Sequence, residues 1–586
     1  MIFTIDFFQY IRMQKKSQNE KKSYEISLSL FLLFLFFTII SKAQDVEHIN
    51  LKKPVTFHGN LNFQLDYYSA NGIPARQKEF SWIINGNPVL NVLGIDLPFT
   101  FLFSNFGNKY SQPFNQFGLS PRYKWITMHL GYRNLTYSNY TLAGHKMLGV
   151  GFDLNPKKFR IGFMYGQLRR SASIDSTMNT NPMYVRPTPT FKRVGIAGKI
   201  GYGSQKNYVD LVYFKGWDKP SSLNGKLKDS IQPAENTSFG LVSTLSLSKK
   251  ITWTSDIGFS AYTLNRMDRK DSSDIDKAWP KDIMGPLVSD KLSTQYYFAG
   301  ETKIGYQEKK WGAQLKLKRI DPGYQSMGAY FFQNDIKEYS LANNFKLDSN
   351  RLNINTNIGI QTDNLKKQKS STSKRFIGSV NVNYVPSQKF GISFNYSNFG
   401  ITNSPLQTSP GNEQYKQVNN SVMLMPYLLW TNEKTFKNLN CIATFQSLST
   451  PQSYGNNTPD MNTFSFSTNY SQTWIKPGIN ANVAMNFINS KTTAGDVGSI
   501  GGSVGGSAPL MKKRLTLNTS FSYLQNKFKG NDNGNTIRFT LGFMVPVGTH
   551  HNFQLMCNYL DNTSKDVSLI QNFKETNIQF IYGLTF

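Results

Sequence analysis

The chain has 586 residues, of which 39% are hydrophobic, and its mean hydropathy is −0.40. Aromatic residues are abundant, with 44 Phe, 30 Tyr and 8 Trp, and 65 Lys and Arg against 36 Asp and Glu give a net charge of +29. A soluble core of this size would use more Leu, Ala and Val, and the two cysteines, Cys441 and Cys557, are too few for a disulfide framework.

Residues 1–43 are predicted to be a signal peptide that is cleaved after Ala43. A basic segment, MQKKSQNEKKSYEIS, precedes the apolar run LSLFLLFLFFTII, and Ser41 and Ala43 are the small residues of a cleavage site. The alternative is a membrane anchor, but a spanning helix needs about 20 apolar residues. The residue directly after the cleavage site is Gln44 and not cysteine, so a lipoprotein is not expected. The peptide holds six basic and three acidic residues, so residues 44–586 carry a net charge of +26.

From about residue 54 onward, the chain repeats stretches in which every second side chain is apolar. Phe159, Ile161, Phe163 and Tyr165, for example, share one face, and Arg160, Gly162 and Gly166 lie on the other. The same alternation recurs at 352–361, 390–396, 515–523 and 537–543. No other apolar run is long enough for a transmembrane helix. We therefore predict an all-β fold, a large single-chain transmembrane antiparallel β-barrel whose strands show the bilayer only half their side chains.

The predicted connections between these strands alternate between short and long. Short turns fall at 155–158, 248–250, 348–350, 385–388, 475–478 and 547–550. Long polar segments fall near 168–190, 217–234, 264–291, 320–336, 400–414 and 561–571. Short periplasmic turns and longer outside loops are typical of outer-membrane barrels. A soluble β-sandwich or propeller is the alternative, and it would show no such bias in loop length.

The chain ends on an alternating strand, KETNIQFIYGLTF, with Phe580, Tyr582, Leu584 and Phe586 on one face. A last strand that closes a barrel leaves no free edge. This ending resembles the C-terminal recognition signal of Gram-negative outer-membrane proteins, and the Asn-, Lys- and Tyr-rich composition is similar to that of barrels of the Bacteroidota. The resemblance implies an outer-membrane location and recognition of the last strand by the barrel-assembly machinery.

Strand counting predicts about 24 strands, within a range of 20 to 26, for a barrel formed by residues 44–586. There are 21 candidate strands after residue 145 and four before it, near 54–68, 79–93, 97–105 and 123–131. The total of 25 is odd, whereas single-chain bacterial barrels have an even count, so one candidate is expected not to be a wall strand. The least regular segment is 106–145, which contains the constriction candidates Arg122, Lys124, Trp125, His129, Arg133 and His145. Two interpretations of this segment stay open: part of it folds into the lumen as a constriction or plug, or it is a long loop with one irregular strand.

The sequence does not predict catalysis. Outer-membrane phospholipases need a Ser/His pair, and outer-membrane proteases need an Asp/His pair. Of the six histidines, only His129 and His145 share a region with serines such as Ser138, and no motif joins them. The histidines are also too scattered for a metal site. We expect no enzyme activity, no metal and no cofactor; catalysis would require His129 or His145 to approach a serine or carboxylate inside the lumen.

Charged residues on the predicted inward faces are mainly basic. They are Arg160, Lys199, Lys303, Lys316, Lys318, Lys346, Arg514 and Arg538. Asp210, Asp256 and Glu301 are the acidic residues on the same strands. A basic lumen concentrates anions and repels cations. The alternative is that these side chains pair with acidic loop residues and only solvate the inner wall.

We therefore expect a porin-like outer-membrane channel for small, preferentially anionic solutes. The alternative is a non-conducting structural or docking barrel of a surface or secretion assembly, with protein partners at long outside loops such as 264–291. A TonB-dependent receptor is not expected, because no plug-sized segment lies between the signal peptide and the first strand. The positive charge is expected to favour lipopolysaccharide as a neighbour, and nucleic acid is not an expected partner.

Overall fold

The computed structural model describes residues 55–105, 115–172, 189–223, 231–271, 281, 284, 288, 290–329, 334–369, 371–405, 415–449, 460–492, 495–565 and 571–586. The predicted signal peptide at 1–43 lies outside these residues. In the described part of the chain, no helix has both the length and the apolar character needed to cross a membrane.

The chain divides into two compact units. The described residues of the first are 55–56 and 91–95, where the backbone N–H of Gly94 donates to Asn91 Oδ1 at 3.2 Å. Residues 57–90 and 96–586 form the other, which is the β-barrel. The following description concerns the barrel unit.

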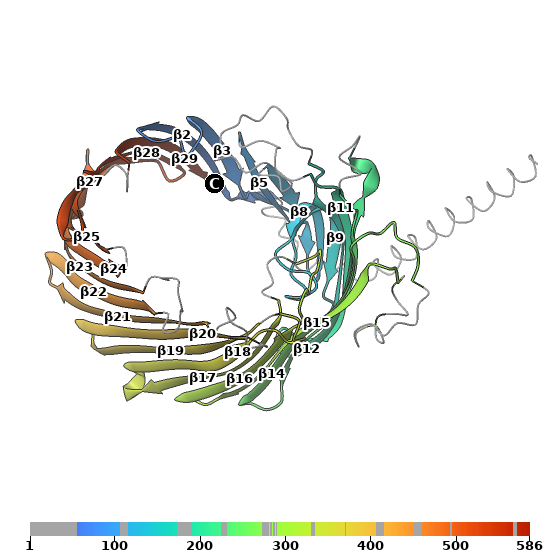
Figure 1. The fold of residues 1–586 in the computed structure, drawn as a ribbon. Coiled ribbons are helices and arrows are strands. Elements are labelled where there is room, and N and C mark those ends of the chain that lie inside the picture. Colours follow the sequence, from blue (N-terminus) through green and yellow to red (C-terminus); the bar gives the residue numbers. More distant parts are fainter. Residues whose placement is uncertain are drawn as a thin grey trace, which may run out of the picture. The chain divides into compact units, whose positions relative to one another are not determined.

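Nearly all described residues of the barrel unit lie in antiparallel strands (Figure 1). The first strands in chain order are β1 (Val55–His58), β2 (Asn60–Asn71), β3 (Phe80–Gly86), β4 (Val89–Val92), β5 (Ile95–Ser104), β6 (Gln116–Leu119), β7 (Arg122–Tyr123), β8 (Ile126–Asn134), β9 (Lys146–Leu154) and β10 (Phe159–Arg169). They are followed by β11 (Lys192–Gly203), β12 (Tyr208–Lys219), β13 (Glu235–Ser246), β14 (Ile251–Thr263), β15 (Thr294–Gln307), β16 (Trp311–Ile320), β17 (Ile336–Leu347), β18 (Leu352–Thr362), β19 (Ser371–Ser387) and β20 (Phe390–Pro405). The last are β21 (Tyr415–Thr431), β22 (Thr435–Ser449), β23 (Met461–Trp474), β24 (Ile479–Thr492), β25 (Gly495–Leu510), β26 (Leu515–Phe528), β27 (Asn531–Val547), β28 (His551–Thr563) and β29 (Phe573–Thr585).

The last strand closes the barrel. β29 pairs with β28 on one side and with β2 on the other, so that Asn60 lies opposite Thr585 and Asn71 opposite Lys574. Beyond this strand, the backbone N–H of Phe586 donates to the carbonyl oxygen of Gly59 at 3.1 Å, and its ring stacks on Phe57 with centroids 4.2 Å apart. Closure leaves no unpaired edge at the seam, which is the condition for a sheet in a bilayer.

The barrel has 26 strands, which confirms the predicted fold class and lies at the top of the predicted range. We expected one of the 25 candidates not to be a wall strand. Instead, the even number is reached because the wall contains one strand more than the candidates. A further wall strand, made of β6 and β7, lies between β5 and β8. This strand is interrupted at Ser120 and Pro121, because proline has no backbone N–H to donate to a neighbouring strand. Each of the two pieces is too short for an alternating pattern to be recognised in the sequence.

The two faces of the sheet differ as the alternation predicts. Outward apolar side chains are widely exposed, for example Ile200 (68%), Leu211 (62%) and Val483 (56%). Their strand neighbours at the next position face the lumen and are mostly polar or small. An exposed apolar outer face is unfavourable in water and suits the hydrocarbon of a bilayer.

The short turns are shaped by local side-chain hydrogen bonds. Ser248 Oγ accepts from the backbone N–H groups of Lys250 and Ile251 at 3.2 and 3.1 Å, and Asn432 Oδ1 accepts from Lys434 and Thr435 at 3.0 and 2.6 Å. Such bonds favour a tight turn over continued strand. The six predicted short turns all join strand ends on one rim of the barrel. The other rim carries the long loops and also the short turn at 529–530 between β26 and β27.

The barrel lumen as the candidate functional site

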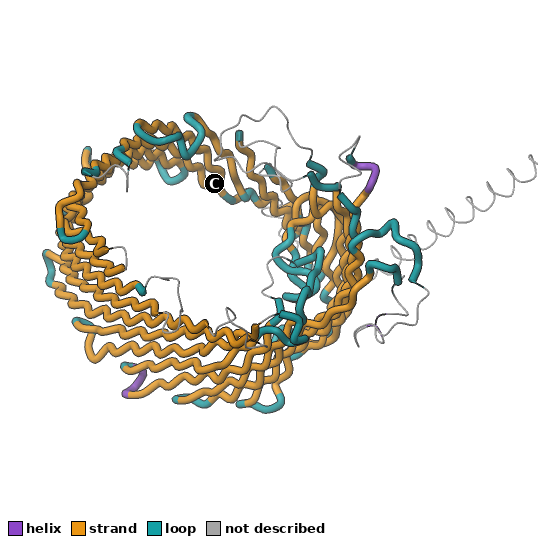
Figure 2. The backbone as a smooth tube through the Cα atoms, viewed as in Figure 1, coloured by secondary structure: helices purple, strands orange, loops and turns teal. Residues whose placement is uncertain are grey.

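A loop of the barrel, residues 135–145, folds inward instead of away from the rim. It joins β8 to β9 on the long-loop rim and packs against the inner wall, where Figure 2 shows loop segments inside the ring of strands. Tyr137 Oη donates to Asp153 Oδ1 at 3.3 Å, and Ser138 Oγ donates to Asp256 Oδ1 at 2.7 Å. These bonds place the loop along the inner face from β9 to β14.

The wall beneath this loop carries a row of inward residues that includes three glycines and an alanine. In register across adjacent strands, the row consists of Asp153, Gly162, Lys199, Val212, Gly240, Gly258, Ala299, Ile320 and Ile336. A Cβ atom at Gly240 would lie 2.6 Å from Thr141 Oγ1, and one at Gly258 would lie 2.7 Å from Tyr140 Cβ. Glycine at these positions therefore lets the loop approach the wall.

A second segment, 321–329, covers the inward loop and fastens it. Tyr324 Oη donates to the carbonyl oxygen of Tyr140 at 2.9 Å, and Ser326 Oγ donates to that of Thr141 at 2.9 Å. The backbone N–H of Ala143 donates to the carbonyl oxygen of Gly328 at 3.0 Å. We call residues 135–145 and 321–329 together the inner layer.

The inner layer and the wall enclose an apolar core inside the barrel. Leu142 from the loop and the inward residues Met164 and Phe214 from the wall are fully buried, and Met327 packs against them. Inward positions of β10 to β15 thus carry apolar side chains because the inner layer covers them, whereas an open lumen would hydrate them.

Buried ion pairs join strands in this filled sector. Arg160 makes a two-point contact with Asp210, at 2.7 and 2.9 Å, and Asp210 is 3% exposed. Near the long-loop rim, Asp218 accepts from Arg193 at 2.8 and 3.0 Å and from Arg169 at 3.3 Å. Two-point arginine contacts are the strong form of such pairs.

His145 ends the inward loop beside this arginine cluster. Its side chain is buried, and burial together with the nearby charges of Arg193 and Arg169 lowers its pKa from 6.5 to about 3. At neutral pH it is therefore uncharged.

His129 bridges Ser120 and Asp153 on the inner face of β8 and β9. Ser120 Oγ lies 3.1 Å from His129 Nδ1, and His129 Nε2 lies 2.9 Å from Asp153 Oδ2. Lys199 Nζ is 3.8 Å from Asp153 Oδ1 and 4.6 Å from the centroid of the Tyr137 ring. Asp153 is therefore shared by the wall and the inward loop. The histidine does approach a serine and a carboxylate, which is the arrangement that catalysis by this chain would require.

The other constriction candidates lie outside the inward loop. Arg122 is exposed on β7, Lys124 and Trp125 are exposed in the turn before β8, and Arg133 is partly buried near the long-loop end of β8. Residues 116–134 thus contribute wall strands, and 135–145 is the inward part of the predicted segment. Residues 106–114 lie outside the described part.

The predicted lumen-lining basic residues fall into two groups. Arg160 pairs with Asp210, Lys199 with Asp153, Lys303 with Glu301 and Lys316 with Glu338. Lys318, Lys346, Arg514 and Arg538 form no ion pair within the described ranges; Arg514 lies in the turn before β26. Asp210 and Glu301 were predicted from the sequence as inward acidic residues, whereas Asp153 and Glu338 were not. The register between strands, which the sequence does not show, decides which acidic and basic side chains are neighbours.

Beyond the inner layer the wall presents a different lining. From β21 to β26, every inward position that the structure describes is uncharged, and none of these side chains is buried. Asparagine, serine and threonine predominate and bond across strands: Ser467 Oγ donates to Asn486 Oδ1 at 2.8 Å, and Asn480 Nδ2 donates to Thr473 Oγ1 at 2.9 Å. We call this sector the amide-lined wall.

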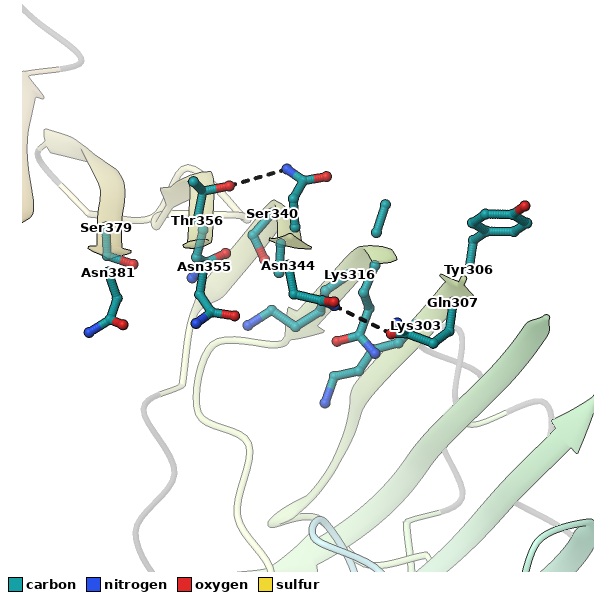
Figure 3. A pocket seen from close by; sticks show the side chains of 15 residues that line it. Lys303, Tyr306, Gln307, Lys316, Ser340, Asn344, Asn355, Thr356, Ser379 and Asn381 are labelled. Carbon is teal, nitrogen blue, oxygen red and sulfur yellow. Dashed lines mark hydrogen bonds between the residues drawn. The ribbon is translucent and has the colours of Figure 1, made fainter. Parts of the chain in front are cut away.

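A recess of about 530 Å³ marks the boundary between the two sectors. Figure 3 shows Lys303, Lys316, Asn344, Asn355 and Asn381 pointing to the same side of the sheet, into the lumen. Asn344, Asn355 and Asn381 are neighbours in register on β17, β18 and β19. The recess therefore combines ammonium groups with an array of amides that can both donate and accept hydrogen bonds.

The predicted assembly signal lies on the outer face of the closing strand. Phe580, Tyr582 and Leu584 are opposite Leu65, Phe63 and Leu61 of β2. In the described part of the chain, no group of three or more His, Cys, Asp or Glu side chains could hold a metal ion.

The chain forms a large single-chain antiparallel β-barrel. No protein-family model and no curated sequence matches it. Among solved structures, it is similar to BauA, the ferric preacinetobactin receptor from Acinetobacter baumannii (9% identity, 90% of this chain and 81% of that chain, TM-score 0.38). It is also similar to the P pilus usher PapC translocation pore (10% identity, 90% of this chain and 99% of that chain, TM-score 0.34). A third similar structure is Pseudomonas aeruginosa OpdK with vanillate (10% identity, 90% of this chain and 99% of that chain, TM-score 0.28).

Proposed function

We propose that the barrel is a porin-like outer-membrane channel for small solutes, with a preference for anions. The amide-lined wall carries the proposal. Uncharged amides and hydroxyls on β21 to β26 are accessible rather than packed, so this sector suits a water-filled path. The inner layer would narrow the lumen from the β9–β16 side and act as the constriction.

The anion preference would come from basic side chains that have no acidic partner within the described residues. Lys346, Arg375 and Arg538 face the lumen opposite uncharged residues of the neighbouring strands. Lys318 lies between Glu301 and Glu338 in register and forms no ion pair with either. Among the inward positions that the structure describes on β18 to β28, only Arg375 and Arg538 carry a charge. Because the paired lysines are neutralised and the amide-lined wall adds no charge, we expect a modest preference rather than exclusion of cations.

Charge reversal should weaken this preference. The double variant Lys318→Glu/Arg538→Glu changes the lumen charge by four, so the reversal potential in a KCl gradient should move toward zero or change sign. Planar-bilayer recording measures it. Lys366→Glu/Lys367→Glu makes the same charge change on the exposed long-loop rim and should shift the potential much less. An equal shift in both variants would show that the anion preference arises at the long-loop rim and not inside the lumen.

We infer a structural role for the Ser120–His129–Asp153 chain. Ser120 and His129 are each 8% exposed, and Asp153 also binds Tyr137 and lies near Lys199, so the three groups tie the wall to the inner layer. A fluorophosphonate probe should therefore leave Ser120 unmodified in the folded barrel, with the same background as Ser120→Ala. Mass-spectrometric detection of the adduct on Ser120 would contradict the inference and support a hydrolase.

The alternative is a non-conducting docking barrel, and the inner layer is the observation that favours it, because a packed apolar core inside a barrel reduces the lumen. Gentle purification with stable partner proteins and no conductance would support it. Under either proposal, the closing strand with Phe580, Tyr582, Leu584 and Phe586 would be the segment that the barrel-assembly machinery recognises, and lipopolysaccharide would surround the long-loop rim.

A further inference from the structure

The rim formed by the short turns is strongly basic. Ten successive turns, from β7–β8 to β25–β26, each contain lysine or arginine. These side chains are Lys124, Lys157, Lys158, Lys206, Lys249, Lys250, Lys309, Lys310, Arg351, Lys389, Lys434, Lys476, Lys512, Lys513 and Arg514, and all are exposed. Glu308, Asp348 and Glu433 are the acidic residues in the same turns. We call the fifteen basic residues the basic rim.

Turn geometry does not account for these lysines. Lys124, Lys157, Lys512 and Lys513 have φ values of 50°, 55°, 57° and 69°, in the left-handed region that favours glycine and asparagine. The chain does use glycine for such a turn at Gly478, where φ is 70°. Lys367 and Lys529 at the opposite rim also have left-handed φ values, 54° and 50°. The number and the position of the basic residues, rather than their backbone conformation, therefore distinguish the basic rim.

Aromatic side chains lie next to the basic rim on the outer face. Trp253, Trp311, Trp430 and Trp474 are outward-facing, 38–41% exposed, and within a few residues of a short turn. Tryptophan concentrates at the level of the lipid headgroups, where its amphipathic ring suits the interface. The turns extend only a few residues further, so their ammonium groups are held at the depth of the lipid phosphates.

We propose that the basic rim binds the headgroup phosphates of anionic phospholipids in the periplasmic leaflet. The depth set by the tryptophans fits lipid phosphate better than a soluble partner. The arrangement also follows ten of the turns around the barrel, which matches a surrounding layer of lipids, whereas a protein partner would need a compact patch. Basic residues near a membrane surface attract anionic lipid with a strength that salt reduces.

Tryptophan quenching by brominated lipids tests the proposal directly. Five of the eight tryptophans, Trp125, Trp253, Trp311, Trp430 and Trp474, lie at this rim and report the local lipid. With the protein purified from membranes and reconstituted, brominated phosphatidylglycerol should compete with phosphatidylcholine at about threefold or greater preference at low salt, falling toward equality in 1 M NaCl.

A matched pair of variants distinguishes an effect of the basic rim from an effect of the net charge of the protein. Lys249→Gln/Lys309→Gln/Lys310→Gln/Lys476→Gln removes four rim charges beside Trp253, Trp311 and Trp474 and should reduce the preference by about half or more. Lys366→Gln/Lys367→Gln/Lys527→Gln/Lys529→Gln removes four exposed charges at the opposite rim and should leave it unchanged. Both variants should show the heat-modifiable migration of a folded barrel. Equal quenching by the two lipids at low salt, or equal loss in both variants, would overturn the proposal.

Discussion

Replacing residues 136–144 with a short glycine–serine linker should raise the single-channel conductance by about twofold or more, because the current follows the free cross-section of the lumen. The loop lies along the inner wall from β9 to β14 and is held there by Asp153 and Asp256 and by Tyr324 and Ser326 of the covering segment. Removing it leaves segment 321–329 without its main support and exposes the lumen that both occupy.

Tyr137→Phe is the control for this deletion. It removes the hydroxyl that donates to Asp153 but leaves the ring in the apolar core with Leu142 and Met164. The loop should stay in place, and the conductance should match that of the unmodified protein. If the linker variant inserts into bilayers with unchanged conductance, the inner layer lies outside the current path and is not a constriction.

Asp218→Ala should lower the stability of the barrel by about 3–5 kcal/mol, because it leaves two arginines without their buried partner. Asp218 is 2% exposed and accepts hydrogen bonds from Arg193 and Arg169 and from the backbone N–H of Ala234. The guanidinium midpoint of tryptophan fluorescence measures the loss. Asp532→Ala breaks an exposed pair with Lys565 and should leave the midpoint nearly unchanged. Similar shifts for both variants would show that the Asp218 cluster is not a major source of stability.

Alternation predicted the barrel because each strand shows one face to lipid and the other to the lumen. Twenty-one strands after residue 145 follow from this period alone, as the run from Phe159 to Tyr165 illustrates. The strand formed by 116–119 and 122–123 was missed because Pro121 divides it into pieces too short to show a period. The inward path of 135–145 was one of two open interpretations, since an aromatic-rich segment fits either a loop or a plug.

The lumen was only partly predictable, because its chemistry depends on strand register. The basic residues Lys303 and Lys316 can be placed inward from the period of two, but their pairing with Glu301 and Glu338 depends on which strand positions are neighbours. Register also turns isolated residues such as Asn355 and Asn381 into an amide array. The bond of His129 to Asp153, 24 residues away, has no sequence motif.

The central claim, a channel with anion preference, is tested most directly by planar-bilayer recording of the purified protein across a KCl gradient. Steady unitary currents whose reversal potential has the sign of chloride selectivity are the predicted result. A bilayer that remains silent after proteolysis or antibody binding has verified insertion would contradict the channel and leave the docking barrel as the account of this fold.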